Sequence, residues 1–268
     1  MSWIEALVLG LIQGLSEYLP VSSSGHLEIA SKLLGISEPE NNITFAVTVH
    51  AATVLSTLIV LFSEVSKLAR GLFTLKWNSE WQYASKILLS MAPVLIVVLL
   101  FRNVIERFFG GSLVVVGCCL LVTAALLALT FFVKPGEGRK ITFWDALIIG
   151  VAQAVALLPG LSRSGATIAT GVLLGNNKEE VAKFSFLMVI IPVLGETFLD
   201  ILKYALNTSS TAVETTGIPF LSLAVGFLAA FISGLIACKW MINLVKKGKL
   251  IYFAVYCAIV GSLTLIFL

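Results

Sequence analysis

Residues 13–26 of the chain, QGLSEYLPVSSSGH, gather several groups that could do chemistry. They include one carboxylate (Glu17), three consecutive serines (residues 22–24) and one histidine (His26). A carboxylate can act as a base or bind a metal, and a serine hydroxyl can act as a nucleophile. An imidazole can donate or accept a proton near neutral pH. Because the flanking sequence is strongly apolar, this polar stretch predicts a functional site.

A second polar stretch appears when the sequence is compared with itself at an offset of 140 residues. Residues 5–35 align with residues 145–175 without a gap, and ten of the 31 positions are identical. The identities that apolar composition does not readily produce are Gln13 with Gln153, Ser22 with Ser162, Ser24 with Ser164 and Gly25 with Gly165. The chain therefore consists of two related halves, each opening with a segment that contains serine and glycine.

The differences between the two copies divide the chemistry between them. Three substitutions matter: Glu17 faces Leu157, Ser23 faces Arg163, and His26 faces Ala166. The first copy carries the titratable groups and the second carries a fixed cation. This division is what a single site assembled from both copies would require.

The elements that must position these groups are membrane helices. Of 268 residues, 58% are hydrophobic and only 12% are charged, and the mean hydropathy is +1.01, whereas soluble domains average about 25% charged residues. Apolar runs of about 20 residues span a bilayer as helices. The spans predicted by such runs are residues 43–62, 87–101, 112–133, 184–201, 218–238 and 250–268. The basic residues lie in the loops between these spans, so the net charge of +3 does not indicate binding to nucleic acid.

The distribution of Lys and Arg predicts how the two polar segments enter the membrane. If both cross completely, the loops carry similar basic charge on the two sides, and the positive-inside rule gives no orientation. If residues 141–175 enter and leave on one side, thirteen Lys and Arg residues share one face and four lie on the other. The repeat extends this interpretation to residues 5–35, which then open outward.

The predicted fold class is an all-α polytopic membrane protein. It has six transmembrane helices plus two re-entrant helix-loop-helix segments, arranged as an inverted repeat with its polar tips near the bilayer middle. The prediction treats residues 1–268 as a single integral membrane domain, with repeat units at about 1–133 and 141–268.

The polar composition of the two tips predicts a phosphate site. Ser-Ser-Ser-Gly and Ser-Arg-Ser-Gly are short turns that can open helices, so backbone N–H groups and hydroxyls can converge on an anion. The guanidinium of Arg163 matches phosphate oxygens. A carboxylate such as Glu17 repels phosphate unless it acts as a base or a divalent cation lies between them.

The motifs QGLSEYLPVSSSGH and PGLSRSGAT resemble the two signature motifs of the bacterial undecaprenyl pyrophosphate phosphatase family of the bacitracin-resistance type. The resemblance covers essentially the whole chain. It implies a plasma-membrane enzyme that removes the terminal phosphate of undecaprenyl pyrophosphate, regenerating the carrier lipid for peptidoglycan and other envelope polymers. It also implies a requirement for a divalent cation, Mg²⁺ or Ca²⁺, and a fold of six spans with two re-entrant segments.

Transferred to this sequence, the family's acidic motif falls on Gln13 and Glu17, and its other motifs fall on residues 20–26 and 159–165. Gln13 stands where some members have glutamate, which leaves Glu17 as the one certain carboxylate of a metal site formed by Glu17 and Gln13. The catalytic residues expected from the resemblance are Glu17, Ser23, His26 and Arg163. The phosphate-binding residues expected are Ser22, Ser24, Gly25, Ser162, Ser164, Gly165 and Thr167.

The roles within this set leave alternatives open. Ser23 is the preferred nucleophile, with Glu17 deprotonating it or holding the metal, and Arg163 stabilising charge on the transferred phosphoryl group. His26 is the rival nucleophile or a proton donor to the leaving group, and attack by a metal-bound water is a third route. His50, alone in an apolar span, is interpreted as an interior histidine with its hydrogen bonds satisfied.

Two other functions compete with the phosphatase. A flippase for a phosphorylated prenyl lipid would also use an inverted repeat with a polar cluster at the membrane midplane, but it has less need of a nucleophile and a base. A structural scaffold does not explain Glu17 and Arg163 inside membrane segments. The expected partners are the undecaprenyl pyrophosphate substrate and the lipid bilayer, a homodimer is compatible with the sequence, and the site is expected to open to the outer face.

Overall fold

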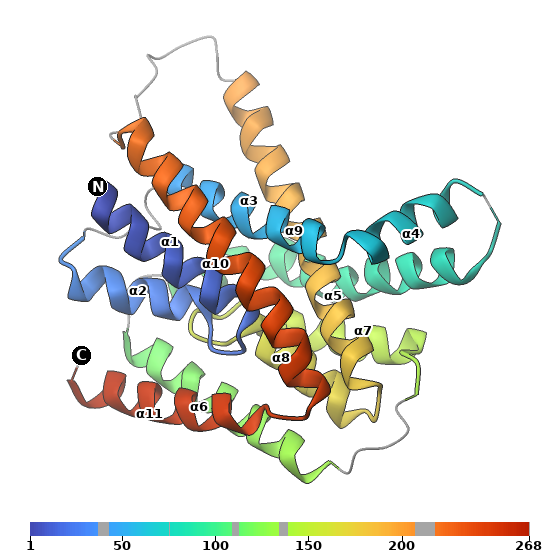
Figure 1. Ribbon diagram of the computed structural model, residues 1–268. Coiled ribbons are helices and arrows are strands. Elements are labelled where there is room, and N and C mark those ends of the chain that lie inside the picture. Colours follow the sequence, from blue (N-terminus) through green and yellow to red (C-terminus); the bar gives the residue numbers. More distant parts are fainter. Residues whose placement is uncertain (37–42, 75, 109–112, 134–138, 207–217, 268) are drawn as a thin grey trace.

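The computed structural model describes residues 1–36, 43–74, 76–108, 113–133, 139–206 and 218–267. Within these ranges, the side chains of residues 43, 102–108, 193–194 and 196–206 are not described. The described residues form eleven α-helices and no strand (Figure 1). This confirms the prediction of an all-helical chain. Glu196, whose role the sequence leaves open, lies among the side chains that are not described.

The helices vary in length from short elements that cannot cross a bilayer to elements of about thirty residues. In chain order they are α1 (Trp3–Tyr18), α2 (Ser23–Leu33), α3 (Ile43–Val60), α4 (Phe62–Leu72), α5 (Ser79–Phe108), α6 (Leu113–Leu129) with the 3₁₀ turn η2 (Thr130–Phe132), α7 (Phe143–Val155), α8 (Arg163–Leu173), α9 (Lys178–Leu206), α10 (Phe220–Lys246) and α11 (Ile251–Phe267).

The two repeated segments fold into the same helix pair in the same register. The first helix of each pair begins with a capping box, formed by Ser2 with Glu5 in α1 and by Thr142 with Asp145 in α7. The second helix begins 140 residues apart in the two copies, at Ser23 and at Arg163, and in both a serine side chain caps its first turn. The local sequence therefore determines where these four helices begin.

The first helix of each copy packs against a helix from the other half of the chain. Helix α1 packs along α10 from the second half, whereas α7 packs along α5 from the first half. In both contacts the backbones approach closely at equivalent glycines, since an added Cβ would meet the carbonyl of Gly226 at Gly10 and the backbone of Ser90 at Gly150. Helices α6 and α11 lie side by side along one edge (Figure 1).

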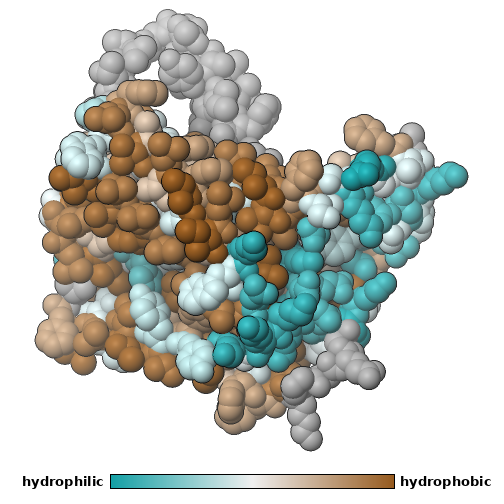
Figure 2. Space-filling model, in the orientation of Figure 1, coloured by the Kyte–Doolittle hydropathy of each residue, from teal (hydrophilic) through white to brown (hydrophobic). Residues whose placement is uncertain are grey.

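Among the described residues, three helices are long and apolar enough to cross a membrane: Ser79–Phe101, Leu113–Phe132 and Phe220–Lys246. A fourth candidate is the pair Thr44–Val60 and Phe62–Leu72, which is bent by 80°. The described residues thus support three or four spans, and they place helices over the remaining predicted spans in α9 and α11. Figure 2 shows apolar residues over most of the visible surface, with hydrophilic residues gathered toward α4 and the start of α9.

Candidate active site

A polar cavity of about 180 Å³ lies where the two repeated segments meet. It is lined by residues from both copies and by one residue of α3. The lining residues are Ser16, Glu17, Ser22, Ser23, Ser24, His50, Ala156, Leu157, Leu158, Leu161, Ser162, Arg163 and Ser164. The structure therefore brings the polar tips of the two copies into one site, as the division of residue types between them predicts.

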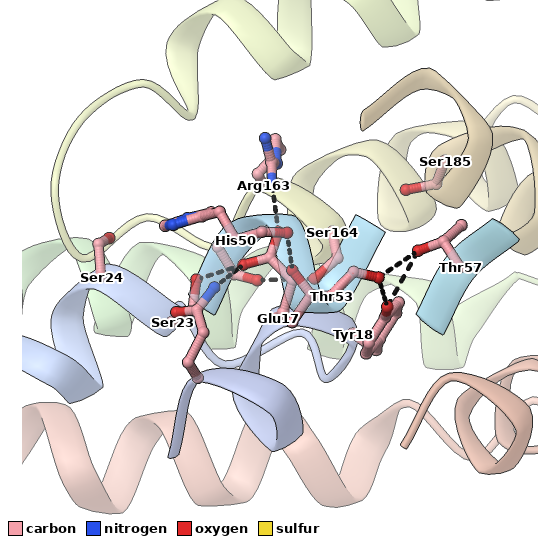
Figure 3. Close-up of polar contacts among 12 residues, drawn as sticks. Glu17, Tyr18, Ser23, Ser24, His50, Thr53, Thr57, Arg163, Ser164 and Ser185 are labelled. Atoms are coloured by element: carbon pink, nitrogen blue, oxygen red, sulfur yellow. Dashed lines mark hydrogen bonds and ion pairs between the residues drawn. The ribbon is translucent and has the colours of Figure 1, made fainter. Parts of the chain in front are cut away.

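Glu17 is the centre of the hydrogen-bond network in this cavity (Figure 3). Its Oε2 accepts hydrogen bonds from Ser23 Oγ at 2.9 Å and from Gln13 Nε2 at 3.0 Å. Its Oε1 forms an ion pair with Arg163 from the other copy. The Glu17 side chain is 5% exposed and that of Arg163 is 27% exposed, so the carboxylate is buried while the guanidinium keeps access to the cavity. Burying a charged carboxylate costs free energy, and the two hydrogen bonds and the ion pair offset that cost.

The local fold explains why these three groups converge. The turn between α1 and α2 reverses the chain, with the N–H of Val21 donating to the carbonyl of Leu19 at 2.8 Å. This turn returns Ser23 to Glu17, which lies six residues earlier, near the end of α1. Ser23 and Arg163 are the first residues of α2 and α8, so equivalent positions of the two copies approach the same carboxylate.

The residues expected to bind phosphate separate into two groups. Four serines line the cavity: Ser22, Ser24, Ser162 and Ser164. The other three expected residues do not line it: Gly25, Gly165 and Thr167. The N–H groups of both glycines are capped by serine side chains, at 3.3 Å in α2 and 3.0 Å in α8, so they hold the helix starts in place.

Thr167 has a supporting position beneath Arg163. Its buried hydroxyl bonds to the carbonyl of Arg163 at 2.9 Å and to the hydroxyl of Ser185 at 2.6 Å. These contacts tie the start of α8 to α9. Thr167 therefore fixes the backbone that carries the guanidinium.

The two histidines lie in the opposite places from those expected from the sequence, which put His26 in the site and His50 outside it. His26 does not line the cavity, whereas His50 does. His50 Nδ1 lies 2.9 Å from the carbonyl of Ala46, one turn earlier in α3, and the side chain lines the same cavity as Glu17. Figure 3 shows His50 beside Glu17 and Arg163, with no hydrogen bond drawn from its ring to Glu17. Only the rule that ionisable residues within membrane helices tend to be functional could have identified His50 from the sequence.

Gln13 lies one turn before Glu17 in α1, is fully buried and does not line the cavity. Its amide nitrogen is bonded to Glu17, but its Oε1 has no hydrogen-bond partner in the described part of the chain. A buried oxygen without a partner is costly and is a suitable ligand for a hard cation. Within the ranges that the structure describes, no three His, Cys, Asp or Glu side chains are grouped closely enough to form a metal site from protein alone.

Comparison with known proteins places this site in a family. The family profile of the bacitracin resistance protein BacA matches residues 6–263. An undecaprenyl-diphosphatase of Parabacteroides distasonis is 58% identical over 265 residues, covering 99% of this chain and 98% of that protein. One from Bacteroides fragilis is 58% identical over 266 residues, with coverage of 99% and 98%, and one from Carboxydothermus hydrogenoformans is 38% identical over 270 residues, with coverage of 99% and 97%. With its repeated motifs, its helical fold and this match over nearly its whole length, the chain belongs to the bacitracin resistance protein BacA family.

Proposed function

We propose that Ser23, Glu17 and Arg163 carry out the reaction of this chain, which is an undecaprenyl-diphosphatase. The observation that carries the proposal is the contact of a serine hydroxyl and a guanidinium, from opposite copies of the repeat, with one buried carboxylate. The names and full-length identity of the relatives support the phosphatase over the lipid transporter. The reaction releases undecaprenyl phosphate and inorganic phosphate.

The chemistry proposed for these residues has two steps. Ser23 Oγ transfers its proton to Glu17 and forms a bond to the terminal phosphorus, and the bond from that phosphorus to the bridging oxygen breaks. Undecaprenyl phosphate leaves with the electron pair of that bond. Water then attacks the phosphorus of the phosphoserine, and the bond from phosphorus to Ser23 Oγ breaks. The proton held by Glu17 returns to Ser23 Oγ, and the atoms of the water leave as part of inorganic phosphate. The guanidinium of Arg163 balances the charge of the phosphoryl oxygens in both steps.

A divalent cation bound at Glu17 is part of the proposal. Glu17 and the unpartnered Oε1 of Gln13 would hold it, and the remaining ligands would be phosphate oxygens and water, as is common for Mg²⁺. When bound, Mg²⁺ or Ca²⁺ would neutralise negative charge on the pyrophosphate. Arg163 and the cavity serines then orient the terminal phosphate toward Ser23.

The proposal includes the membrane arrangement expected from the sequence. Six spans and two re-entrant segments would place α1–α2 and α7–α8 as the re-entrant pairs, entering from opposite faces and meeting at the cavity. Their short lengths and the exchanged packing of the two copies support this arrangement. The excess of Lys and Arg on one face then makes the cavity open outward. Recycling of the carrier lipid at that face accounts for bacitracin resistance as the family's characteristic property.

The direct test is phosphate release from undecaprenyl pyrophosphate by the purified protein in detergent, with Mg²⁺, with Ca²⁺ and with EDTA. We expect release with either cation, its loss in EDTA and its return when the cation is restored. We also expect the Arg163→Ala variant to lose at least about a hundredfold in kcat/KM, the scale for removal of a charge-stabilising group. Folded wild-type protein that releases no phosphate with any cation would contradict the proposal.

A further inference from the structure

His26 is held at both ring nitrogens, on the side of α2 that faces α11. Its Nδ1 lies 2.9 Å from the carbonyl oxygen of Ser22, and its Nε2 lies 2.8 Å from the hydroxyl oxygen of Tyr256. The rings of His26 and Tyr256 are stacked, with centroids 5.5 Å apart and planes inclined by 14°. Tyr256 is 42% exposed, which places this pair on the flank of the helix bundle.

The partners of the two nitrogens determine the tautomer. The carbonyl of Ser22 can only accept a hydrogen bond, so Nδ1 carries the proton. In the neutral ring Nε2 then has a lone pair, and the hydroxyl of Tyr256 is its donor. With both nitrogens engaged and the ring outside the cavity, His26 is not placed to attack phosphorus.

The group that His26 holds has an unusual backbone conformation. Ser22 has φ of 70° and ψ of 100° and is the one non-glycine residue with positive φ among the described residues. Such a conformation persists only where the surroundings enforce it. The carbonyl of Ser22 accepts both the ring N–H of His26 and its backbone N–H, the latter at 3.2 Å. The next residue is Ser23, whose hydroxyl contacts Glu17.

The second copy of the repeat provides an internal comparison. Ser162, the equivalent of Ser22, has an ordinary φ of −72° and caps its helix in the same way. The equivalent of His26 is Ala166, whose backbone N–H donates to the carbonyl of Ser162 at 2.8 Å. In the copy with the relaxed turn, the carbonyl of Ser162 thus has no hydrogen bond from the side chain of Ala166. In the copy with the strained turn, the carbonyl of Ser22 accepts one from the imidazole of His26.

We propose that Tyr256 is a positioning residue of the phosphatase that acts through His26. Its hydroxyl fixes the tautomer and orientation of the imidazole, the imidazole holds the carbonyl of Ser22, and this contact keeps Ser23 Oγ aligned with Glu17. The inference rests on the proposed function, in which Ser23 is the nucleophile. It assigns His26 to the support of the turn, in place of a role as nucleophile or proton donor.

Two substitutions of His26 distinguish a role in holding the carbonyl of Ser22 from a direct role in the reaction. Asparagine places its amide nitrogen near the position of Nδ1, so His26→Asn keeps a donor for the Ser22 carbonyl. Glutamine places its amide nitrogen near the position of Nε2, so His26→Gln loses that donor. We expect His26→Asn to retain at least about a tenth of the wild-type kcat and His26→Gln to be about tenfold slower again, the scale of one coupled hydrogen bond. Activity in His26→Gln together with inactivity in His26→Asn would overturn the inference.

Tyr256 is tested with Tyr256→Phe, which keeps the stacked ring and removes only the hydroxyl. The matched control is Tyr252→Phe, one turn earlier on α11 and more exposed. We expect Tyr256→Phe to lower kcat about tenfold at unchanged KM and melting temperature, and the control to be unchanged. In the His26→Asn background, which has no atom at the Nε2 position, we expect Tyr256→Phe to have an effect of less than about twofold.

The outcomes also distinguish this inference from the proposed function. If the wild type releases no phosphate, the proposed function fails. If the wild type is active but Tyr256→Phe has no effect, or lowers kcat equally in the wild-type and His26→Asn backgrounds, the proposed function stands and the positioning role is wrong.

Discussion

Ser23 and Glu17 are the residues on which the proposed chemistry depends most directly. The 2.9 Å contact between them gives the serine proton an acceptor, and burial keeps water from competing for the carboxylate. The network assigns different tasks to similar residues, because the hydroxyls of Ser22 and Ser162 are occupied in capping helices. The hydroxyl of Ser23 is therefore the one that donates to Glu17.

The first prediction at this scale concerns the nucleophile. We expect Ser23→Ala to lower kcat by at least about a thousandfold and Glu17→Gln by at least about a hundredfold, because each removes a group that takes part in bond formation or proton transfer. Ser31→Ala is the matched control, since Ser31 is buried on the same helix and its hydroxyl donates to the carbonyl of Leu27 and to no other described residue. Phosphate release at saturating substrate measures all three. Ser23→Ala with more than a tenth of wild-type kcat would show that another group attacks phosphorus.

The second prediction concerns His50, which faces the cavity from α3. Its Nδ1 is engaged with Ala46, which leaves Nε2 as the polar atom of the ring available to substrate or water. We expect His50→Leu to lower kcat/KM about tenfold, since it replaces a polar wall of the phosphate cavity with an apolar one, and His50→Gln to lose less. Steady-state kinetics on folded variants measure this effect, and equal rates for His50→Leu and wild type would contradict it.

At the scale of the elements, the positions of α1 and α7 depend on close helix contacts. Small residues let backbones approach in membranes, where packing has to replace the hydrophobic effect between helices. Gly10 meets Gly226 of α10, and Gly150 meets Ser90 of α5. These contacts hold α1 against α10 and α7 against α5, and each of the two helices leads to one polar tip of the cavity.

We expect Gly10→Ala and Gly150→Ala each to lower the free energy of unfolding by about 1–3 kcal/mol, because the added methyl group would overlap neighbouring backbone. Gly195→Ala is the matched control, since a Cβ at this helical glycine would meet no atom of the described residues within 4 Å. Denaturation in mixed detergent micelles measures the changes. If the control is destabilised as much as Gly10→Ala, close packing is not the cause.

At the scale of the whole molecule, the proposed inverted arrangement determines which side of the membrane reaches the cavity. Leu157 lines the cavity, and Trp77 lies 66% exposed between α4 and α5, in a loop that the proposed arrangement assigns to the face with excess basic charge. With that face inside, the two positions are accessible from opposite sides.

We expect a single cysteine at Leu157→Cys, in a cysteine-free and active background, to react with a membrane-impermeant maleimide added outside right-side-out vesicles. A single cysteine at Trp77→Cys should react only after the vesicles are opened. The extent of labelling by mass spectrometry measures both. Labelling in the reverse pattern would mean that the cavity opens inward.

The sequence by itself determined the helical class, the internal repeat and the residue types of the site, because these depend on local features. Apolar run length predicts helices, and serine before glycine predicts the helix starts, which the structure confirms at Ser22 and Ser162. The pairing of Glu17 with Arg163 could be anticipated because the repeat gave one copy the carboxylate and the other the cation.

Only the tertiary structure decided which polar residues reach the cavity. Whether a side chain on a membrane helix faces a site, a neighbouring helix or lipid depends on helix rotation and packing, which one sequence does not encode locally. His26 and His50 show this directly: His26 belongs to the motif but stacks on Tyr256, 230 residues away, whereas the isolated His50 is brought to Glu17 by the packing of α3. The same reason explains Thr167, whose hydroxyl the fold uses to join α8 to α9.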